Sequence, residues 1–333
     1  MKFPKTFTSL CLAATLCASA AVTASATVTV SDGIFEYLYT DDAWTLCKYI
    51  GNQTEVTLPS EFGGSPVTEI APYCFSQTDV TAVTIPDSFN TIGSYAFCEC
   101  EALQNVSFSA SLKNLGTGAF YSSGLREADL SLTQLDTVNS LMFCCCKSLT
   151  AVSLPPTVFK IDNRSFSESG LTEIVLPEGV TVVGDSCFEN SAVRAVVLPE
   201  SLQAIGASAF RGAEKLRELY LPDNISDIGA YALYPMSVRG SIHVDCFSNS
   251  FAAAYCYENF VTNVTEYTKL FGDANLDGTV NVNDVTELQR YCSEYLQFNR
   301  PAQFLADVTH DRSVQIDDAT TIQLFLSEFI DAL

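Results

Sequence analysis

The chain has little histidine, a single tryptophan and few basic residues. Two of its 333 residues are His, and 17 Lys and Arg stand against 39 Asp and Glu, which gives a formal net charge of −22 at pH 7. Such a charge repels the phosphates of nucleic acids and the surfaces of anionic membranes. We therefore expect no nucleic-acid partner, whereas a cation is a suitable ligand.

Side chains suited to catalysis are also scarce. His243 falls in a segment predicted to close a repeat array, and His310 falls at a non-ligand position of an acidic loop. Neither accompanies a GxSxG or papain-like Cys motif. Carboxylate pairs that could hydrolyse glycosides arise by chance among 39 acids. We predict no catalytic residues, and an unrecognised hydrolase is the least favoured hypothesis.

Long apolar runs are missing beyond the first residues. No later segment approaches the ~18–20 apolar residues that a membrane helix needs, so we expect no membrane insertion. Lys2 and Lys5 precede an uncharged stretch that ends in Ala24-Ser25-Ala26. This order is typical of a secretory signal peptide. We therefore expect residues 1–26 to be removed and the remainder to be secreted.

Cysteine is present, but an odd eleven of the 13 remain beyond residue 26, so complete internal pairing is excluded. Cys74 and Cys187 occupy a repeat position where neighbouring copies carry Ala, and we interpret them as small core residues. The cysteines at 98, 100 and 144–146 fall in predicted loops, where a disulfide or a metal site stays open. Zinc is disfavoured there because paired CxxC spacing and a nearby His are missing.

A frame of about 23 residues recurs through the middle of the chain. It is visible in "VTAVTIPDSFNTIGSYAF" from Val80, "LTEIVLPEGVTVVGDSCF" from Leu171 and "VRAVVLPESLQAIGASAF" from Val193. Each copy predicts a short alternating strand, a Pro that ends it, and a second apolar patch. An aromatic residue then closes the turn. It recurs at Phe75, Phe97, Phe120, Phe143, Phe166, Phe188 and Phe210, with Leu233 last.

Two copies depart from this frame. An early copy carries an insertion at residues 63–66, and "LSLTQLDTVNSLMF" lacks both the Pro and the Gly, so we expect irregular turns there. One unit cannot bury its apolar face alone, but stacked units share a continuous core. The repeats therefore predict a mainly β solenoid.

The repeat pattern resembles the BspA-like leucine-rich repeats of bacterial surface and secreted proteins over about residues 54–237. The resemblance implies a capping hairpin at residues 27–53 and an array with its C-terminal cap at residues 54–261. Strand alternation predicts an outward face, which is the usual partner-binding surface of solenoids. We assign to it Asn105, Glu127, Asp129, Glu173, Glu218 and Tyr220.

A solvated acidic surface explains that face equally well. Tyr220 is its only aromatic residue, and stacking on sugar rings normally uses several. A glycan platform on this face is therefore disfavoured. The partner of the repeats is an unknown protein, cell-surface ligand or glycan.

Near the C-terminus, "DANLDGTVNVND" (residues 273–284) concentrates oxygen ligands in one loop. Calcium prefers about six to eight oxygens, which a 12-residue loop with Gly at position six can supply. The predicted ligands are Asp273, Asn275, Asp277, the Thr279 carbonyl, Asn281 (directly or through water) and Asp284. A helix should follow, with Val285, Leu288, Tyr291, Cys292 and Tyr295 on its apolar face.

The loop is duplicated 34 residues later in "DVTHDRSVQIDD" (residues 307–318). The matching ligand positions hold Asp307, Thr309, Asp311, Ser313, Gln315 and Asp318. The matching helix positions hold Ala319, Ile322, Phe325, Leu326 and Phe329. Arg312 replaces Gly at position six, where positive φ costs on the order of 1 kcal/mol. We therefore predict weaker calcium binding in the second loop.

The two loop–helix halves resemble a type I dockerin, a small all-α calcium-binding module, over residues 268–333. The stretch 261–269 leaves only a short linker to the repeats. The resemblance implies structural Ca2+ and binding to a cohesin module of a scaffold protein in a cellulosome-type complex. It implies recognition through Val282, Asn283, Gln289, Arg290, Ile316, Asp317, Gln323 and Leu324. None of these forms the Ser-Thr or Lys-Arg pair of the best-known members.

The favoured hypothesis is a secreted, non-catalytic interaction protein, held outside the cell or at its surface through a scaffold complex. The alternative is a carbohydrate-binding accessory component of a complex that degrades plant polysaccharides.

Overall fold

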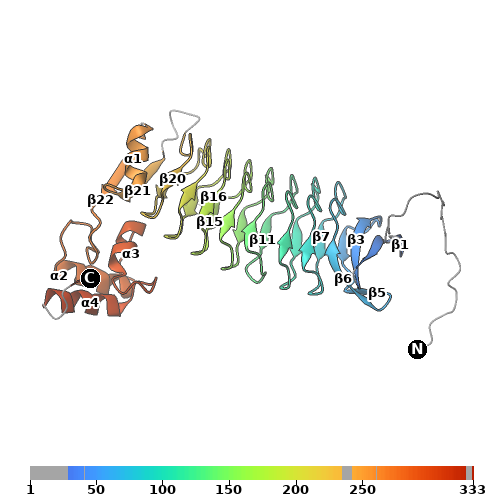
Figure 1. Cartoon of the computed structure of the whole chain (residues 1–333), viewed down its shortest axis with the longest axis horizontal. Helices are drawn as coiled ribbons and strands as arrows, with labels where there is room; N and C mark the ends of the chain where they lie inside the picture. The colour runs from blue at the N-terminus through green and yellow to red at the C-terminus, as the bar shows by residue number, and fades with distance from the viewer. Residues whose placement is uncertain (1–28, 41, 235–241, 260, 328–331) are drawn as a thin grey trace, which may run out of the picture.

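The computed structural model describes residues 29–40, 42–234, 242–259, 261–327 and 332–333. The expected signal peptide and Phe329 lie outside these ranges. The described chain forms a rod of stacked β turns, with a helical module at its C-terminal end (Figure 1). In the described part of the chain, none of the helices has the length and apolar character needed to cross a membrane.

The N-terminal end of the rod is closed by an antiparallel hairpin, as the sequence predicts for this region. β1 (Thr29–Ser31), β2 (Phe35–Thr40) and β3 (Ala43–Tyr49) pair in order, and β3 continues in parallel onto β6 (Ser65–Ile70). The insertion at residues 63–66 forms the turn between β5 (Glu61–Phe62) and β6. Tyr37 stacks on Phe62 with ring centroids 4.1 Å apart, so aromatic rings cover the end of the core.

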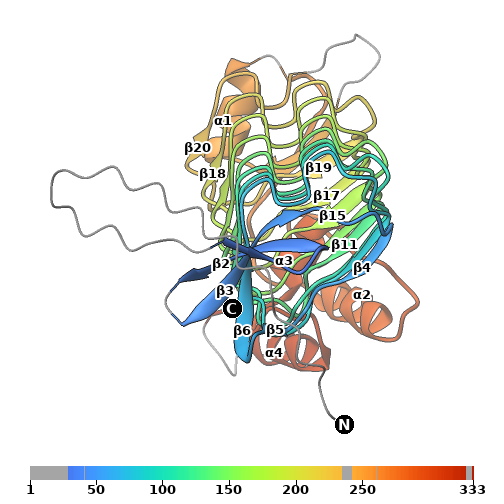
Figure 2. The same cartoon turned by 90° about the vertical axis from the view of Figure 1, so that its right-hand side faces the viewer.

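Each repeat contributes one strand to each of two rows. The first row consists of β4 (Glu55–Thr57), β7 (Ala82–Thr84), β9 (Asn105–Ser107), β11 (Glu127–Asp129), β13 (Ala151–Ser153), β15 (Glu173–Val175), β17 (Ala195–Val197) and β19 (Glu218–Tyr220). The second row consists of β6, β8 (Thr91–Ile92), β10 (Asn114–Leu115), β12 (Thr137–Val138), β14 (Lys160–Ile161), β16 (Val182–Val183), β18 (Ala204–Ile205) and β20 (Asp227–Ile228). All pairings within these rows are parallel. The turns nearly superimpose when viewed along the rod (Figure 2).

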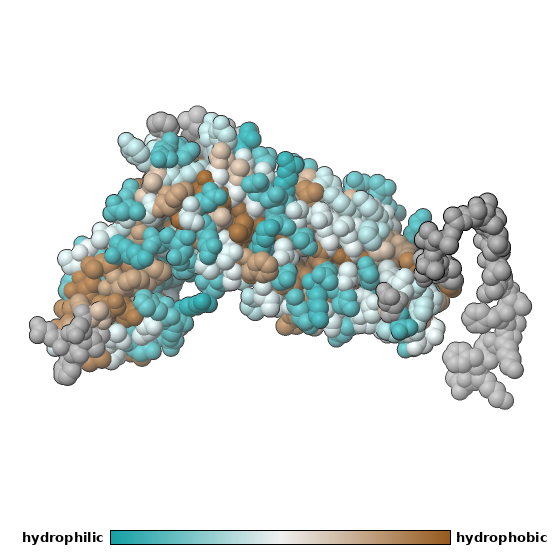
Figure 3. Space-filling view, in the orientation of Figure 1, coloured by the Kyte–Doolittle hydropathy of each residue, from teal (hydrophilic) through white to brown (hydrophobic). Residues whose placement is uncertain are grey.

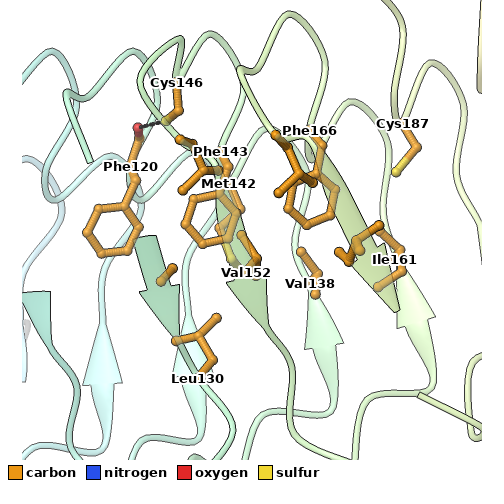
Figure 4. Packing of buried hydrophobic residues seen from close by; sticks show 14 of the residues in the cluster. Phe120, Leu130, Val138, Met142, Phe143, Cys146, Val152, Ile161, Phe166 and Cys187 are labelled. Carbon is orange, nitrogen blue, oxygen red and sulfur yellow. Dashed lines mark hydrogen bonds between the residues drawn. The ribbon is translucent and has the colours of Figure 1, made fainter. Parts of the chain in front are cut away.

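The predicted aromatic column is confirmed as the centre of the core. From Phe75 to Phe210, successive Phe rings lie 4.9 to 5.7 Å apart, with interplanar angles of at most 17°. Figure 4 shows Phe120, Phe143 and Phe166 in this stack, above the apolar residues of the strands. Each ring is fully buried. Such pairs contribute about 0.5–1.5 kcal/mol each beyond the area they bury, so the column stabilises every turn through its neighbours.

Two residues with left-handed backbone flank each Phe of the column. They lie two positions before and two positions after it, as Ser186 (φ 53°) and Asn190 (φ 55°) do around Phe188. Only Gly118 and Gly212 are glycines among these fourteen positions. A non-Gly residue in this region costs roughly 1–2 kcal/mol. The packing of the Phe column therefore holds the backbone in a conformation that local preference disfavours.

The predicted irregular unit is confirmed in the second row, where β10 and β12 do not pair. Five of the turns carry Gly after this strand, at positions 93, 116, 184, 206 and 229. The preceding turn approaches closely there; a Cβ on Gly116 would lie 2.4 Å from the Ser94 nitrogen. Asn139 stands at that position in the irregular unit. Its Nδ2 donates to the Leu115 carbonyl at 2.5 Å, in place of the backbone bond that Gly184 donates to Ile161.

The C-terminal end of the rod is closed by strands and a helix. β21 (His243–Phe247) pairs with β19, and β22 (Val264–Tyr267) pairs with β21. α1 (Phe251–Glu258) lies between them in sequence. The prediction that residues 261–269 form a linker is therefore wrong for 264–267, because their backbone completes this sheet.

The C-terminal module contains α2 (Val282–Cys292), α3 (Arg300–Ala306) and α4 (Ile316–Leu326). α2 and α4 bury Val285, Leu288, Ala319 and Ile322 in a small core of their own, as predicted. The predicted apolar face is wrong at Cys292, Tyr295 and Leu326, which are exposed. α2 ends at Cys292, so Tyr295 lies beyond the helix. The short helix α3 between the halves was not predicted.

Candidate metal loops and interaction surfaces

The first loop (residues 273–284) folds around the carboxylate of Asp273. This side chain is only 1% exposed, and it accepts hydrogen bonds from the backbone N–H groups of Asp277 (3.0 Å) and Gly278 (2.8 Å). Gly278 has φ 83°, so Gly at position six meets a backbone requirement. The loop thus wraps around an inward-pointing carboxylate at position one.

Asp284, at position twelve, holds the other end of the same loop. It is 0% exposed and accepts from the backbone N–H groups of Asn275 (3.1 Å) and Asn281 (2.8 Å). Asn281 is the N-cap of α2, and Asp284 completes the capping box. Burial raises the pKa of Asp284 above its usual value; the backbone N–H groups of Asn281 and Asn275 oppose this shift, and the charges of Asp273 and Asp277 add to it. The chain therefore places a carboxylate where its own charge is unfavourable without a cation.

The second loop (residues 307–318) repeats the four backbone hydrogen bonds to the aspartates at positions one and twelve. Asp307 accepts from the backbone N–H groups of Asp311 (3.1 Å) and Arg312 (2.9 Å). Asp318, which is fully buried, accepts from those of Thr309 (3.0 Å) and Gln315 (2.8 Å). The expected positive φ of Arg312 is confirmed at 72°. The duplication inferred from sequence therefore extends to the backbone, and the strain at position six is present in the second loop only.

The donor set of both loops fits a hard cation. None of the ion pairs in the described part of the chain involves these aspartates, so their charges are not neutralised by Lys or Arg. Within the same residues, no group of three or more His, Cys, Asp or Glu side chains is arranged to hold a metal ion. A cation held here would depend on amide and backbone oxygens as well as carboxylates, which is the mixture that calcium accepts.

All eight side chains assigned to cohesin recognition are exposed. They lie at the start and on the outer faces of α2 and α4, and Val282 and Ile316 are the most exposed apolar members, at 66% and 58%. Figure 3 shows apolar surface gathered over the C-terminal module. The exposed large apolar side chains there are Leu270, Val282, Tyr295, Ile316, Leu324 and Leu326. The geometry leaves these surfaces accessible, and their role stays a prediction.

The predicted solenoid face is exposed at Asn105, Glu127, Asp129, Glu173 and Glu218. The prediction is wrong for Tyr220, which is 7% exposed. Its ring packs edge-on against Phe247 at 6.2 Å, in a cluster that also includes Leu305 of α3. Alternation along a strand predicts which way a side chain points, but it does not reveal that the C-terminal module covers this end of the face.

The histidines and cysteines have structural surroundings. His243 bonds to Asn263 (3.0 Å) and Thr265 (3.1 Å) across the terminal sheet. The described cysteines are all free thiols. Cys74 and Cys187 are buried, as predicted, and burial raises their pKa far above the usual range.

Two of the loop cysteines make the same contact in different repeats. The Cys100 thiol donates to the Phe75 carbonyl and the Cys146 thiol to the Phe120 carbonyl, each at 2.9 Å. Figure 4 shows the contact between Cys146 and Phe120. Burial raises the pKa of Cys146 to about 11. High thiol pKa values make thiolate chemistry unfavourable at neutral pH, so these residues serve turn packing.

The parallel two-row coil and its repeating Phe column define a leucine-rich repeat solenoid. The model of the BspA type leucine rich repeat region matches in six copies, over residues 68–194 and 181–297. The chain belongs to this family.

Several solved structures are similar to the chain. A leucine rich cell surface protein from Faecalibacterium prausnitzii is 22% identical, with a TM-score of 0.42 over 75% of this chain and 80% of that one. The T. pallidum leucine rich repeat protein is 27% identical, with a TM-score of 0.44 over 60% and 85%. The pneumococcal vaccine antigen PcpA is 14% identical, with a TM-score of 0.44 over 72% and 97%. A search of curated proteins gave no match.

Proposed function

We propose that this chain is a secreted, non-catalytic interaction protein whose C-terminal module is a calcium-dependent, dockerin-like anchor. The observation that carries the proposal is the duplicated loop, in which two carboxylates point inward and four backbone N–H groups orient them in each copy. An acidic turn exposed to solvent would not need to bury Asp284 and Asp318 completely.

Calcium supplies charge neutralisation and coordination bonds when bound. The residues that would hold it in the first loop are Asp273, Asn275, Asp277, Thr279 through its carbonyl, and Asp284, with Asn281 directly or through water. At a free concentration 100 times the dissociation constant, one ion adds about 2.7 kcal/mol to the stability of the folded state. That is a large share of the stability of a module with so small a core.

The exposed positions on α2 and α4 support a partner-binding role for the module. Their two sets differ: the first pairs Val282 with polar Gln289 and Arg290, while the second pairs Ile316 with apolar Leu324. A cohesin module of an extracellular scaffold is the proposed partner. Because the two sets are chemically unlike, we expect one orientation of the partner to dominate.

The solenoid supplies the second interaction surface. Leucine-rich repeat arrays present extended faces for partners, and the signal-peptide pattern of residues 1–26 supports an extracellular place for this chain. Its exposed first-row acids, Glu127, Asp129, Glu173 and Glu218, suit a protein or cell-surface ligand with basic groups. A glycan is the alternative partner, since Tyr73 and Tyr231 are exposed on the turns. Binding of the full chain to insoluble plant polysaccharide in the presence of calcium would favour the alternative.

The anchor is tested by calcium titration and capture with the full chain. Isothermal titration calorimetry should detect calcium binding by wild-type protein and its loss from the first loop in Asp273→Ala, with exposed Asp227→Ala as a matched control. Immobilised wild-type chain should retain a cohesin-bearing scaffold protein from the producing cells' medium in calcium and release it to a chelator. Retention that chelation and Asp273→Ala leave unchanged would contradict the proposal.

A further inference from the structure

The C-terminal module is docked on the solenoid through the start of α3. Arg300, the first residue of this helix, donates from Nη2 to the Leu198 carbonyl at 3.3 Å, and the same nitrogen lies 3.9 Å from the Glu178 carboxylate. Both partners belong to the segments that follow first-row strands β15 and β17. A guanidinium from the module therefore bridges two successive turns of the solenoid.

An aromatic contact lies beside this polar one. Phe304 of α3 packs against Phe247 of β21, with ring centroids 5.4 Å apart, and against Phe271 at the same distance. Leu305 is fully buried in a cluster with Tyr220 and Phe247. Consecutive residues of one short helix thus bury apolar surface against the end of the solenoid.

Lys269 adds a further link between the two parts. Its Nζ pairs with Asp223 of the solenoid at 2.5 Å and lies 5.5 Å from the centre of the Phe304 ring. The contact therefore combines two ion pairs, a backbone hydrogen bond and an apolar patch. This composition is typical of a specific interface between domains, rather than of a chance contact.

Both metal loops are attached directly to this docking helix. α3 ends at its C-cap Asp307, which is the first ligand position of the second loop. The carbonyl of Leu305 accepts the backbone N–H of Gly272 at 2.8 Å, and Gly272 immediately precedes Asp273, the first ligand position of the first loop. A cavity of about 540 Å3 lies where the second loop meets the solenoid, lined by Glu178, Arg300 and Arg312 among others.

We propose that calcium binding by the loops and docking of the module on the solenoid are thermodynamically coupled through α3. This inference rests on the proposed calcium role of the loops. An ion that fixes the position-one aspartates also fixes the C-terminal end of α3, through Asp307 in sequence and through the Gly272–Leu305 hydrogen bond. By reciprocity, contacts that hold α3 on the solenoid raise the affinity of the loops for the ion. Contact with the solenoid therefore increases the calcium affinity of the C-terminal module.

The test compares full-length variants by calcium titration calorimetry. Phe304→Ala removes the ring contacts with Phe247 and Phe271, and Arg300→Ala removes the bridge to Leu198 and Glu178. Neither residue occupies a ligand position. We expect each variant to raise the calcium dissociation constant about fivefold or more. Tyr295→Ala is the matched control, since this aromatic side chain lies on the same module and is 83% exposed; its dissociation constant should equal that of wild type.

Small-angle X-ray scattering supplies a second measure that does not depend on ligand affinity. Chelation should increase the radius of gyration of the wild-type chain. At a calcium concentration that saturates wild type but not Phe304→Ala, the variant should have a larger radius of gyration than wild type. Circular dichroism of each variant checks that the helices persist. Equal dissociation constants in wild type, Phe304→Ala and Arg300→Ala would overturn the coupling while leaving the calcium sites intact. Absence of calcium binding by wild type would overturn the proposed function itself.

Discussion

The solenoid buries one continuous core through many equivalent contacts, whereas the C-terminal module has a small core beside two acidic loops. One continuous apolar cluster extends from Phe35 to Cys256 through every turn. Among the described residues of the module, seven buried apolar side chains form the separate core of α2 and α4. Repetition lets the solenoid tolerate a defective turn such as the one at Asn139. The module has no such redundancy, so we expect its stability to depend on an ion.

The largest expected effect is a loss of solenoid stability when one ring of the Phe column is removed. Phe166→Ala removes a ring that stacks on both neighbours, at 5.6 and 5.4 Å. Truncation of a buried Phe costs about 3–5 kcal/mol. Chemical denaturation should show this loss in the solenoid transition, with calcium affinity unchanged. A cost below 1 kcal/mol would mean that the column does not carry the core.

The second largest effect should be a loss of calcium binding and of stability in the C-terminal module. Asp284→Ala removes a fully buried ligand position and the capping box of α2. We expect calcium binding at the first loop to disappear and the module to lose about the 2.7 kcal/mol that an ion at 100 times its dissociation constant supplies. Helical circular dichroism during thermal unfolding measures the loss. Asp318→Ala should have a smaller effect, and the reverse order would contradict the assignment of the first loop as the stronger site.

Docking of the module on the solenoid should depend on pH through the buried carboxyl of Glu200. Burial raises the pKa of Glu200 to about 7, Arg300 opposes this shift, and Glu178 and Asp223 add to it. Glu200 shares the lining of the cavity between the second loop and the solenoid with Arg300 of α3. We therefore expect undocking to expose Glu200, so that the docked state binds its proton more tightly than the undocked state does. Its contribution to docking is present below the usual pKa of 4.5 and is lost as pH rises through about 7. The radius of gyration of wild type, measured by small-angle X-ray scattering, should change between pH 6 and 8, whereas that of Glu200→Gln should stay constant. The same pH dependence in both proteins would refute this role.

The smallest effect concerns the difference between the loops. Arg312→Gly relieves a positive φ of 72° at position six of the second loop. We expect a gain of about 1 kcal/mol, measured as about fivefold tighter calcium binding at that site. Arg312→Lys keeps the side-chain charge and the backbone strain, so it should bind calcium as wild type does. Equal affinity of the Gly and Lys variants would show that strain does not separate the loops.

Much of the solenoid could be predicted from sequence because its signals are periodic and local. The alternating strands and the Phe column follow from side-chain spacing alone. The left-handed residues around each Phe could not be predicted, because Ser, Asn, Tyr and Arg stand there where a turn motif would show Gly. Tertiary packing imposes that backbone, and only Gly118 and Gly212 mark it in the local composition.

The ligand positions of the loops could be predicted from the sequence, whereas the interface between the module and the solenoid could not. Asp273 and Asp284 were predicted as inward-pointing ligand positions, since residue type and spacing encode the turn. The burial of Tyr220 and the existence of α3 depend on how two distant segments meet. Pro301 and Asn299 mark the start of α3 in hindsight, as a Pro in the first turn after an Asn N-cap. The apolar pair Phe304 and Leu305 was the available signal that this short helix has a buried side.

Scanning calorimetry of the full-length wild-type chain, with calcium and with a chelator, tests the central claim most directly. The account predicts two unfolding transitions, of which the helical one rises markedly in temperature with calcium while that of the solenoid moves little. A helical transition at the same temperature in both conditions would contradict the claim that the duplicated loops hold a stabilising ion.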